Sequence, residues 1–100
     1  MTENNGWEKI ESDMLKWENE GQELEGVFID RQHSSEYHNY IYTVSTDDGD
    51  VTFWGSTVLN TKLNRVDEGD RIKIILTEFK EHEKKGYSPI KMFDVFVKHK

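Results

Sequence analysis

The sequence predicts a mainly β protein, a five-stranded Greek-key barrel with one short helix between its third and fourth strands. Two observations carry this prediction. From Leu24 onward, five runs show the alternation of apolar and polar residues that is typical of strands, and one stretch with helical spacing interrupts them. The chain has 100 residues, which suits a single domain. We therefore expect an acidic extension over residues 1–20, packed on the barrel as a short helix or strand, and a barrel domain over residues 21–100.

The predicted strands are rich in β-branched and aromatic residues, which fit the half-buried surface of a sheet. They cover Leu24–Gln32, Tyr37–Thr46, Val51–Trp54, Ile72–Phe79 and Ile90–Lys98. Between the second and third strands, Asp47–Asp50 contains an Asp-Gly pair, which is typical of a tight hairpin turn. Inward rows are expected at Ile72, Ile74 and Leu76 in the fourth strand and at Phe93, Val95 and Val97 in the fifth.

The single predicted helix follows Gly55. Leu59, Leu63 and Val66 recur at spacings of four and three, and Ser56 or Thr57 is expected to cap its first turn. Three strands, one short helix and two strands within roughly 75 residues are typical of the OB-fold. A small SH3-like barrel is the alternative, although its helical element is usually a single turn.

The N-terminal extension has its own pattern. Residues 1–25 hold eight acids and two bases, so they carry −6 of the formal net charge of −7. Large apolar residues recur there at the helical spacings of three, four and three: Trp7, Ile10, Met14 and Trp17. A helix is the favoured interpretation, and a short strand over Met14–Trp17, with Leu15 and Trp17 on one face, is the alternative.

Composition excludes several classes of protein. The absence of cysteine excludes a disulfide scaffold and thiolate zinc sites, and no apolar run approaches the roughly 20 residues of a membrane helix. The polar, acidic N-terminus predicts no secretory signal, so we expect a cytoplasmic protein (in the host cytoplasm if the source is viral) without membrane contact. The acids and histidines form no local catalytic or metal-binding motif, so no enzyme activity, metal or cofactor is predicted.

The negative net charge does not exclude nucleic acid as a partner, because the charge is unevenly spread. Residues 26–100 hold twelve acids and eleven bases, and residues 71–100 alone hold four acids and eight bases. A net of +4 over the last thirty residues is compatible with phosphate binding.

The aromatic residues point to base stacking. If Val27 and Ile29 face the core, Phe28 faces outward, and if Phe53 faces the core, Trp54 faces outward. Exposed rings on a barrel stack the bases of a single strand. The stacking candidates are Phe28, Tyr37, Tyr40, Trp54 and Tyr87, with core packing as the alternative for Tyr37, Tyr40 and Trp54. The candidates for phosphate contacts are Arg31, Lys84, Lys85 and Lys91, because Lys and Arg beside aromatic residues suit a single strand.

Several segments resemble small phage-type single-stranded DNA-binding proteins of the OB-fold. They are Leu24–Phe28, Tyr42–Gly49, Phe53–Leu59 and Val66–Ile72, and the resemblance spans roughly residues 21–97. It implies sequence-tolerant binding of single-stranded DNA in replication or recombination, without catalysis or cofactor. The implied partner is single-stranded DNA, and replication or recombination proteins are further candidate partners. Composition leaves a monomer and a small homo-oligomer open.

Two other functions fit the same residues. In a protein-interaction OB module that binds no nucleic acid, the exposed aromatics would contact a protein partner. An RNA-binding or structure-specific protein would use the same rings and would distinguish RNA from DNA through the 2′-hydroxyl.

Overall fold

The computed structural model describes residues 14–81, 84, 86 and 89–100. The chain runs through β1 (Glu23–Ser34), β2 (Asn39–Thr46), β3 (Gly49–Trp54), α1 (Thr57–Leu63), β4 (Arg71–Lys80) and β5 (Ile90–Lys98). The strands form one antiparallel sheet in the order β3-β2-β1-β4-β5. The mainly β class and the order of strands and helix are thus confirmed.

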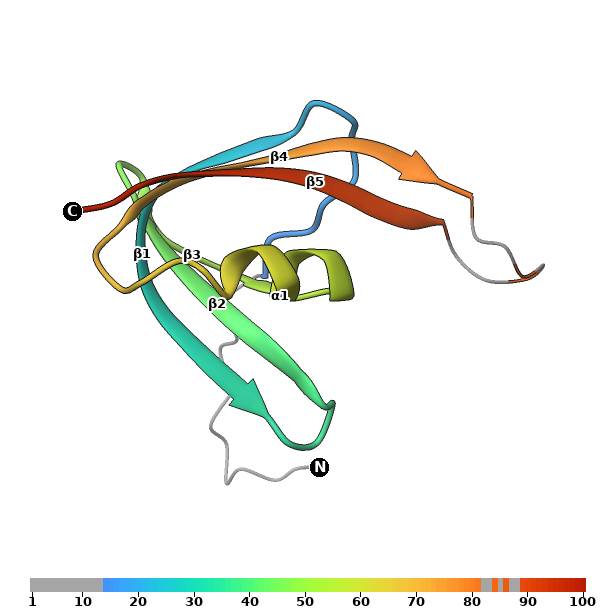
Figure 1. Cartoon of the computed structure of the whole chain (residues 1–100), viewed down its shortest axis with the longest axis horizontal. Helices are drawn as coiled ribbons and strands as arrows, with labels where there is room; N and C mark the ends of the chain where they lie inside the picture. Colours follow the sequence, from blue (N-terminus) through green and yellow to red (C-terminus); the bar gives the residue numbers. More distant parts are fainter. Residues whose placement is uncertain (1–13, 82–83, 85, 87–88) are drawn as a thin grey trace, which may run out of the picture.

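The sheet bends around the helix. Figure 1 shows β4 and β5 crossing above α1, whereas the β1–β2 hairpin descends below it. β1 lies at the centre, paired with β2 on one side and with β4 on the other. The edge strands β3 and β5 do not pair with each other in the described part of the chain, so the sheet is open and the predicted barrel closure is not confirmed.

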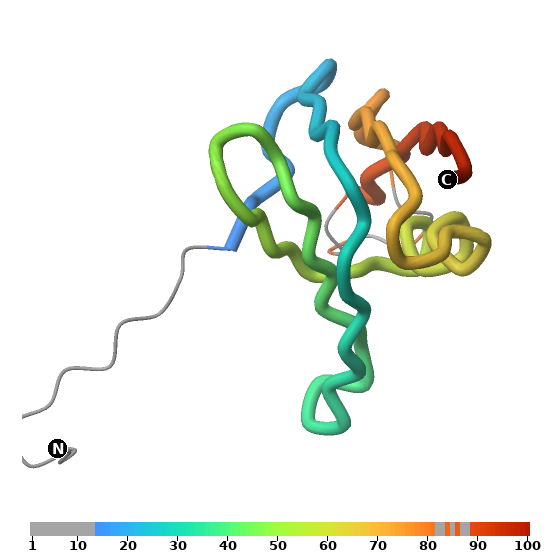
Figure 2. Tube along the Cα trace, turned by 90° about the vertical axis from the view of Figure 1, so that its left-hand side faces the viewer, coloured from blue at the N-terminus to red at the C-terminus, as the bar shows by residue number. Residues whose placement is uncertain are grey.

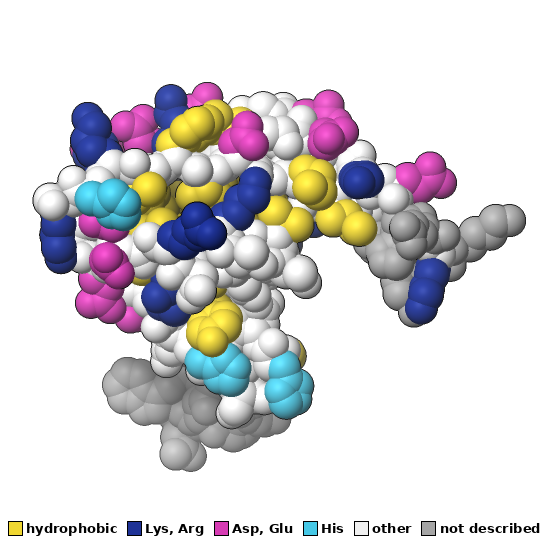
Figure 3. Space-filling model, in the orientation of Figure 1, with side chains coloured by type: hydrophobic (Ala, Val, Ile, Leu, Met, Phe, Trp, Pro, Cys, Tyr) yellow, Lys and Arg dark blue, Asp and Glu magenta, His cyan; other side chains and the backbone are white. Residues whose placement is uncertain are grey.

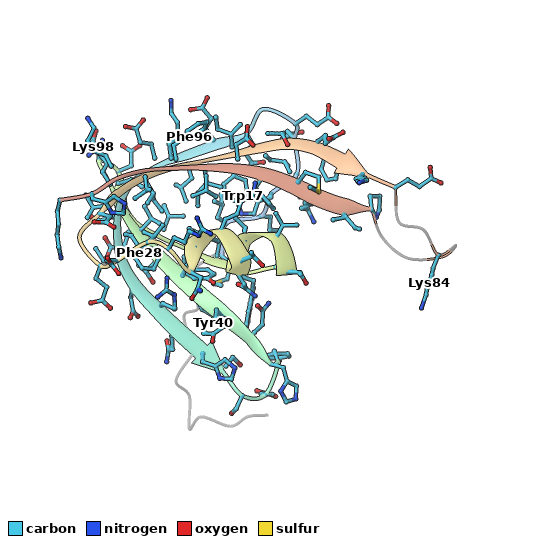
Figure 4. The ribbon with its side chains drawn as sticks, viewed as in Figure 1. Trp17, Phe28, Tyr40, Lys84, Phe96 and Lys98 are labelled. Carbon is cyan, nitrogen blue, oxygen red and sulfur yellow. The ribbon has the colours of Figure 1, made fainter. Side chains whose placement is uncertain are left out.

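Trp17 packs between the two open edges. Its ring lies 5.9 Å from the ring of Phe53 on β3 and 5.1 Å from the ring of Phe93 on β5, edge to face in both pairs. Only 7% of Trp17 is exposed. A bulky aromatic residue therefore fills the space that separates β3 from β5, and Figure 4 shows Trp17 between β5 and α1.

The segment around Trp17 is extended, not helical. The backbone N–H of Leu15 donates to the carbonyl of Thr52 on β3 (2.8 Å), and that of Gly21 donates to the carbonyl of Leu76 on β4 (2.7 Å). The predicted helix is thus wrong for residues 14–17, and the alternative that placed Leu15 and Trp17 on one face is closer, because both pack against the core. Residues 7–13 of that prediction lie outside the described residues. Figure 2 shows the described start of the chain on the side of the molecule opposite α1.

The inward rows of β4 and of α1 are confirmed. Ile72, Ile74 and Leu76 are buried, as are Leu59 and Leu63 of α1, and Val66 is buried beyond the end of the helix. In β5, Phe93 is buried, but Val95 is half-buried and Val97 is exposed, because the strand extends past the core.

The predicted cap and hairpin turn are also found. The side chain of Ser56, not that of Thr57, accepts a hydrogen bond from the N–H of Leu59 (3.2 Å), which satisfies one of the free donors of the first helical turn. Gly49 has a φ of +115° where the β2–β3 turn ends, a conformation that glycine adopts without strain.

Candidate nucleic-acid interface

Two exposed aromatic side chains meet where β3 ends and β1 turns into β2. Tyr37 lies in the β1–β2 turn and is 63% exposed, and Trp54 ends β3 and is 36% exposed. Their ring centroids are 5.3 Å apart with an interplanar angle of 77°, an edge-to-face pair. The predicted exposure of both residues is confirmed, and their contact with nucleic acid stays a prediction.

The backbone around Gly55 fixes the end of β3. The N–H of Gly55 donates to the carbonyl of Tyr40 (2.8 Å), and its own carbonyl accepts from Nδ2 of Asn39 (3.0 Å). A Cβ atom at Gly55 would collide with Oδ1 of Asn60 and lie 2.9 Å from Cε2 of Tyr42, so a larger residue here would displace these side chains. Trp54 is therefore held on a rigid strand end.

Tyr40 belongs more to the core than to the surface. Its ring stacks against Tyr42, with centroids 6.1 Å apart, and His33 approaches it edge-on at 5.0 Å. Tyr40 is half-buried, so it offers a base less free surface than Tyr37 does. Tyr42 itself is buried, which raises the pKa of its phenol, and the hydroxyl donates to Oδ1 of Asn60 (2.7 Å).

The outward orientation predicted for Phe28 is wrong. Phe28 is 0% exposed, and Leu24, Gly26 and Phe28 form the inward row of β1, whereas Ile29 is exposed. Alternation of residue types defines the two faces of a strand but does not say which face is buried. In addition, the pairing of β1 with β2 is irregular just after Phe28, where the register shifts. Phe28 is therefore a core residue that has no free face for stacking.

Arg31 joins β1 to the end of α1. Its guanidinium donates to the carbonyls of Leu63 (2.5 Å) and Val66 (3.1 Å) at the end of α1. The same group lies 5.1 Å from the ring centroid of Phe28 and 5.9 Å from that of Tyr42. Cations are favourable at the carbonyl end of a helix. Both hydrogen bonds come from Nη2 and hold Arg31 against α1, and its contact with a phosphate stays a prediction.

The predicted lysines lie on another part of the molecule. Lys91 is exposed at the start of β5, opposite Phe79 of β4, and Lys84 is exposed in the β4–β5 connection. Figure 4 shows Lys84 at the far end of the β4–β5 hairpin and Tyr40 on the separate β1–β2 hairpin. Lys85 and Tyr87 lie outside the described residues. The structure therefore brings Tyr37 and Trp54 together but does not bring Lys84 to them.

The charged residues are also divided between the two parts of the sheet, β1 to β3 and β4 to β5. β1, β2 and β3 carry four acids and a single cationic residue, Arg31, which faces inward. β4 and β5 carry five cationic residues and two acids. The cationic residues that would bind phosphates therefore lie along β4 and β5. Trp54 ends β3, which is the strand at the opposite edge of the sheet.

Sequence reasoning missed one strongly exposed aromatic residue, Phe96. It is 54% exposed in β5 and pairs across the sheet with Lys73 of β4. The signal was present, because an inward row at Phe93, Val95 and Val97 leaves Phe96 on the outer face. A shallow depression of about 280 Å³ beside Phe96 is lined by Arg71, Lys73 and Lys98 among others.

Among the described residues, no group of three or more His, Asp or Glu side chains is placed to hold a metal ion. In the same part of the chain, no helix has the length and apolar character to cross a bilayer.

Comparison of this chain with protein-family models, with curated proteins and with solved structures finds no match.

Proposed function

We propose that the protein is an OB-fold module that binds single-stranded DNA in a sequence-tolerant way, during replication or recombination. The strand order β3-β2-β1-β4-β5, with α1 between β3 and β4, supports the OB-fold assignment, and Trp17 would occupy the place where β3 and β5 meet in a closed barrel. The observation that carries the functional proposal is the exposed Tyr37–Trp54 pair. Both rings present free surface to solvent, Trp54 from the end of β3 and Tyr37 from the β1–β2 turn, as a base-stacking site requires.

In this proposal the two parts of the molecule have different roles. Tyr37 and Trp54 stack bases, and the cations of β4 and β5, including Lys91, attract the phosphates of the same strand. Base stacking is tolerant of sequence because every base has an aromatic face. The protein therefore needs no hydrogen-bonding pattern for particular bases.

A fluorescence titration with oligothymidylate tests the proposal. Trp54→Ala and Tyr37→Ala are each expected to lower affinity by about 5- to 150-fold, since stacking contributes about 1–3 kcal/mol per base. The matched variants Trp54→Phe and Tyr37→Phe keep an aromatic face and should bind within a few-fold of wild type. Trp54→Phe should also lose most of the tryptophan quenching. Equal affinity of the alanine variants would remove the stacking role.

The salt dependence tests the phosphate contacts separately. If Lys91 contacts a phosphate, Lys91→Gln should reduce the slope of log K against log salt by about 0.7, whereas Trp54→Ala should leave the slope unchanged. An unchanged slope for Lys91→Gln would place the phosphates elsewhere. A parallel titration with RNA of equal length separates a DNA preference from an RNA preference.

The alternative is a protein-interaction module. The acidic charge of β1 and β3 and the exposed apolar surface of β5 favour it. An absence of binding to any oligonucleotide at low salt would support this function over the first.

A further inference from the structure

The second half of β5 is an open sheet edge. β5 pairs with β4 alone among the described strands. The carbonyl of Met92 accepts a hydrogen bond from a β4 side chain, whereas that of Phe93, the next residue, accepts from Nζ of Lys62 on α1 (2.5 Å). Backbone groups alternate sides along a strand, so those of Val95 and Val97 also point away from β4. α1 therefore covers the edge at Phe93 and leaves the following residues open.

This open edge is apolar on both faces. Phe96 is 54% exposed on the outer face, and on the inner face Val97 is 38% exposed. Val95 and Val97 line a shallow groove of about 340 Å³ against α1, together with Lys62 and Arg65. Figure 3 shows dark blue Lys and Arg side chains beside yellow hydrophobic ones over this face. An edge strand with unpaired backbone groups and exposed apolar side chains is a template for another strand.

The charges on the edge are arranged symmetrically about Phe96. Asp94 lies two residues before it and Lys98 two residues after it, so all three side chains share the outer face. No ion pair involves Asp94 or Lys98 within the described part of the chain. By contrast, Arg71 and Lys73 on the adjacent β4 each pair with a glutamate of β1, at 3.2 and 3.9 Å. One acid and one base thus remain without a partner, equally spaced from an exposed ring.

We propose that β5 of a second copy of this chain pairs antiparallel with β5 along this edge, centred on Phe96. In that register Phe96 faces its own counterpart, Asp94 of each copy faces Lys98 of the other, and Val95 faces Val97. The pairing satisfies the free backbone groups and places apolar side chains of the two copies side by side on each face of the sheet. It ends at Phe93, where Lys62 occupies the carbonyl.

The pattern itself favours a second copy as the occupant. An antiparallel strand must carry a base opposite Asp94 and an acid opposite Lys98, and β5 of another copy provides both in one register. A shift of two residues would place Phe96 against a charged side chain. The contact involves only about five residues per chain, so the dimer is expected to be transient.

Sedimentation equilibrium of the full chain without nucleic acid tests this proposal independently of the proposed function. The wild type should show reversible dimerisation that increases with concentration. Asp94→Lys and Lys98→Asp should each raise the dissociation constant by about tenfold, because each places two like-charged pairs in the homodimer. An equimolar mixture of the two variants should recover association, since opposite charges then face each other at both positions. A chain with both substitutions should dimerise as well.

A proline variant tests the backbone pairing. Val97→Pro removes an N–H that points away from β4, so it should abolish association while circular dichroism and thermal unfolding confirm the fold. Lys80→Asp is the control. It reverses a charge in the same way but at the end of β4 that pairs with Ile90, away from Phe96, so it should leave the dissociation constant unchanged. A wild type that stays monomeric up to its solubility limit would overturn the proposal. So would association that is insensitive to the Asp94 and Lys98 variants, or a mixture that fails to recover it.

Discussion

Phe28 and Arg31 lie on the inner face of β1 and join the sheet to the helix. The Phe28 ring is fully buried and packs beside Tyr42, with ring centroids 6.1 Å apart. The Arg31 guanidinium covers both rings and donates to two carbonyls at the end of α1. Both residues are predicted nucleic-acid contacts on the sequence, but Phe28 is a core residue, and Arg31 bonds to the end of α1.

Phe28→Ala should lower the free energy of unfolding by about 3–5 kcal/mol, because it removes a buried ring from a packed core. Urea denaturation measures this loss. Phe28→Leu should cost less, since it preserves most of the volume. At a temperature where Phe28→Ala is still folded, its affinity for oligothymidylate should equal that of the wild type. A stable variant with weakened binding would contradict the core assignment.

Asp70 is a buried carboxylate at the turn before β4. It accepts hydrogen bonds from the N–H of Asp67 (2.9 Å) and of Lys100 (3.2 Å), and its Oδ2 lies 3.0 Å from Nδ1 of His99. The Asp67 hydrogen bond contributes most to lowering the pKa of Asp70, and the Lys100 and His99 contacts add to it against the opposing effect of burial. The ionised carboxylate thus links the chain end to the β4 turn.

The lowered pKa of Asp70 gives stability a defined pH dependence. Because the pKa in the folded state lies below the unfolded value of about 4, the stabilisation is present above about pH 4 and is lost as the pH falls through the folded pKa. Urea unfolding of wild type and Asp70→Asn across the acidic range should show a weaker pH dependence in the variant. Asp47→Asn, in an exposed turn, serves as the control. Parallel pH profiles for Asp70→Asn and wild type would contradict the role of the carboxylate.

At the scale of elements, the segment before β1 completes the core. Leu15 bonds to β3, Trp17 packs on both edge strands, and the N–H of Gly21 bonds to β4. The spacing of apolar residues in this segment fits a helix locally. Its extended form follows from contacts with Thr52, Phe53 and Phe93, which lie far away in the sequence, so local periodicity could not predict it.

Two truncations separate the core segment from the acidic residues before it. Deletion of residues 1–13 should leave thermal unfolding close to that of the full chain, whereas deletion of residues 1–20 should destabilise it by several kcal/mol, as expected for loss of a buried Trp17. Trp17→Ala in the full chain should reproduce about 3–5 kcal/mol of that loss. Equal stability of both truncated chains would show that Trp17 contributes little to the core.

At the scale of the whole molecule, charge is divided between the N-terminal segment and the last two strands. Residues 1–13 hold four acids and one base, whereas β4 and β5 carry five cationic residues and two acids. The net charge of the whole chain therefore reflects the N-terminal extension more than it reflects the sheet. The field near β4 and β5 is more favourable to phosphates than the total of −7 suggests.

Removal of residues 1–13 should strengthen binding of oligothymidylate at low salt, since it removes a net charge of −3 that repels phosphates. The gain should shrink as salt rises, because screening weakens interactions between exposed charges. The matched control is the full chain with Glu3, Glu8 and Glu11 changed to Gln. It should reproduce most of the effect. Identical affinities of all three proteins at low salt would show that the extension has no electrostatic role.

Local alternation and local turn chemistry are enough to predict the order of the elements, their approximate bounds, the hairpin turn at Gly49, the capped helix and the inward row of β4. The packing of the whole sheet decided which face of β1 is buried, and so placed Phe28 in the core. It also decided that Arg31 bonds to α1, that Trp17 fills the open side of the sheet, and that Trp54 and Lys84 lie on separate hairpins. These outcomes depend on sheet register and curvature, which bring distant residues together and which no local pattern contains.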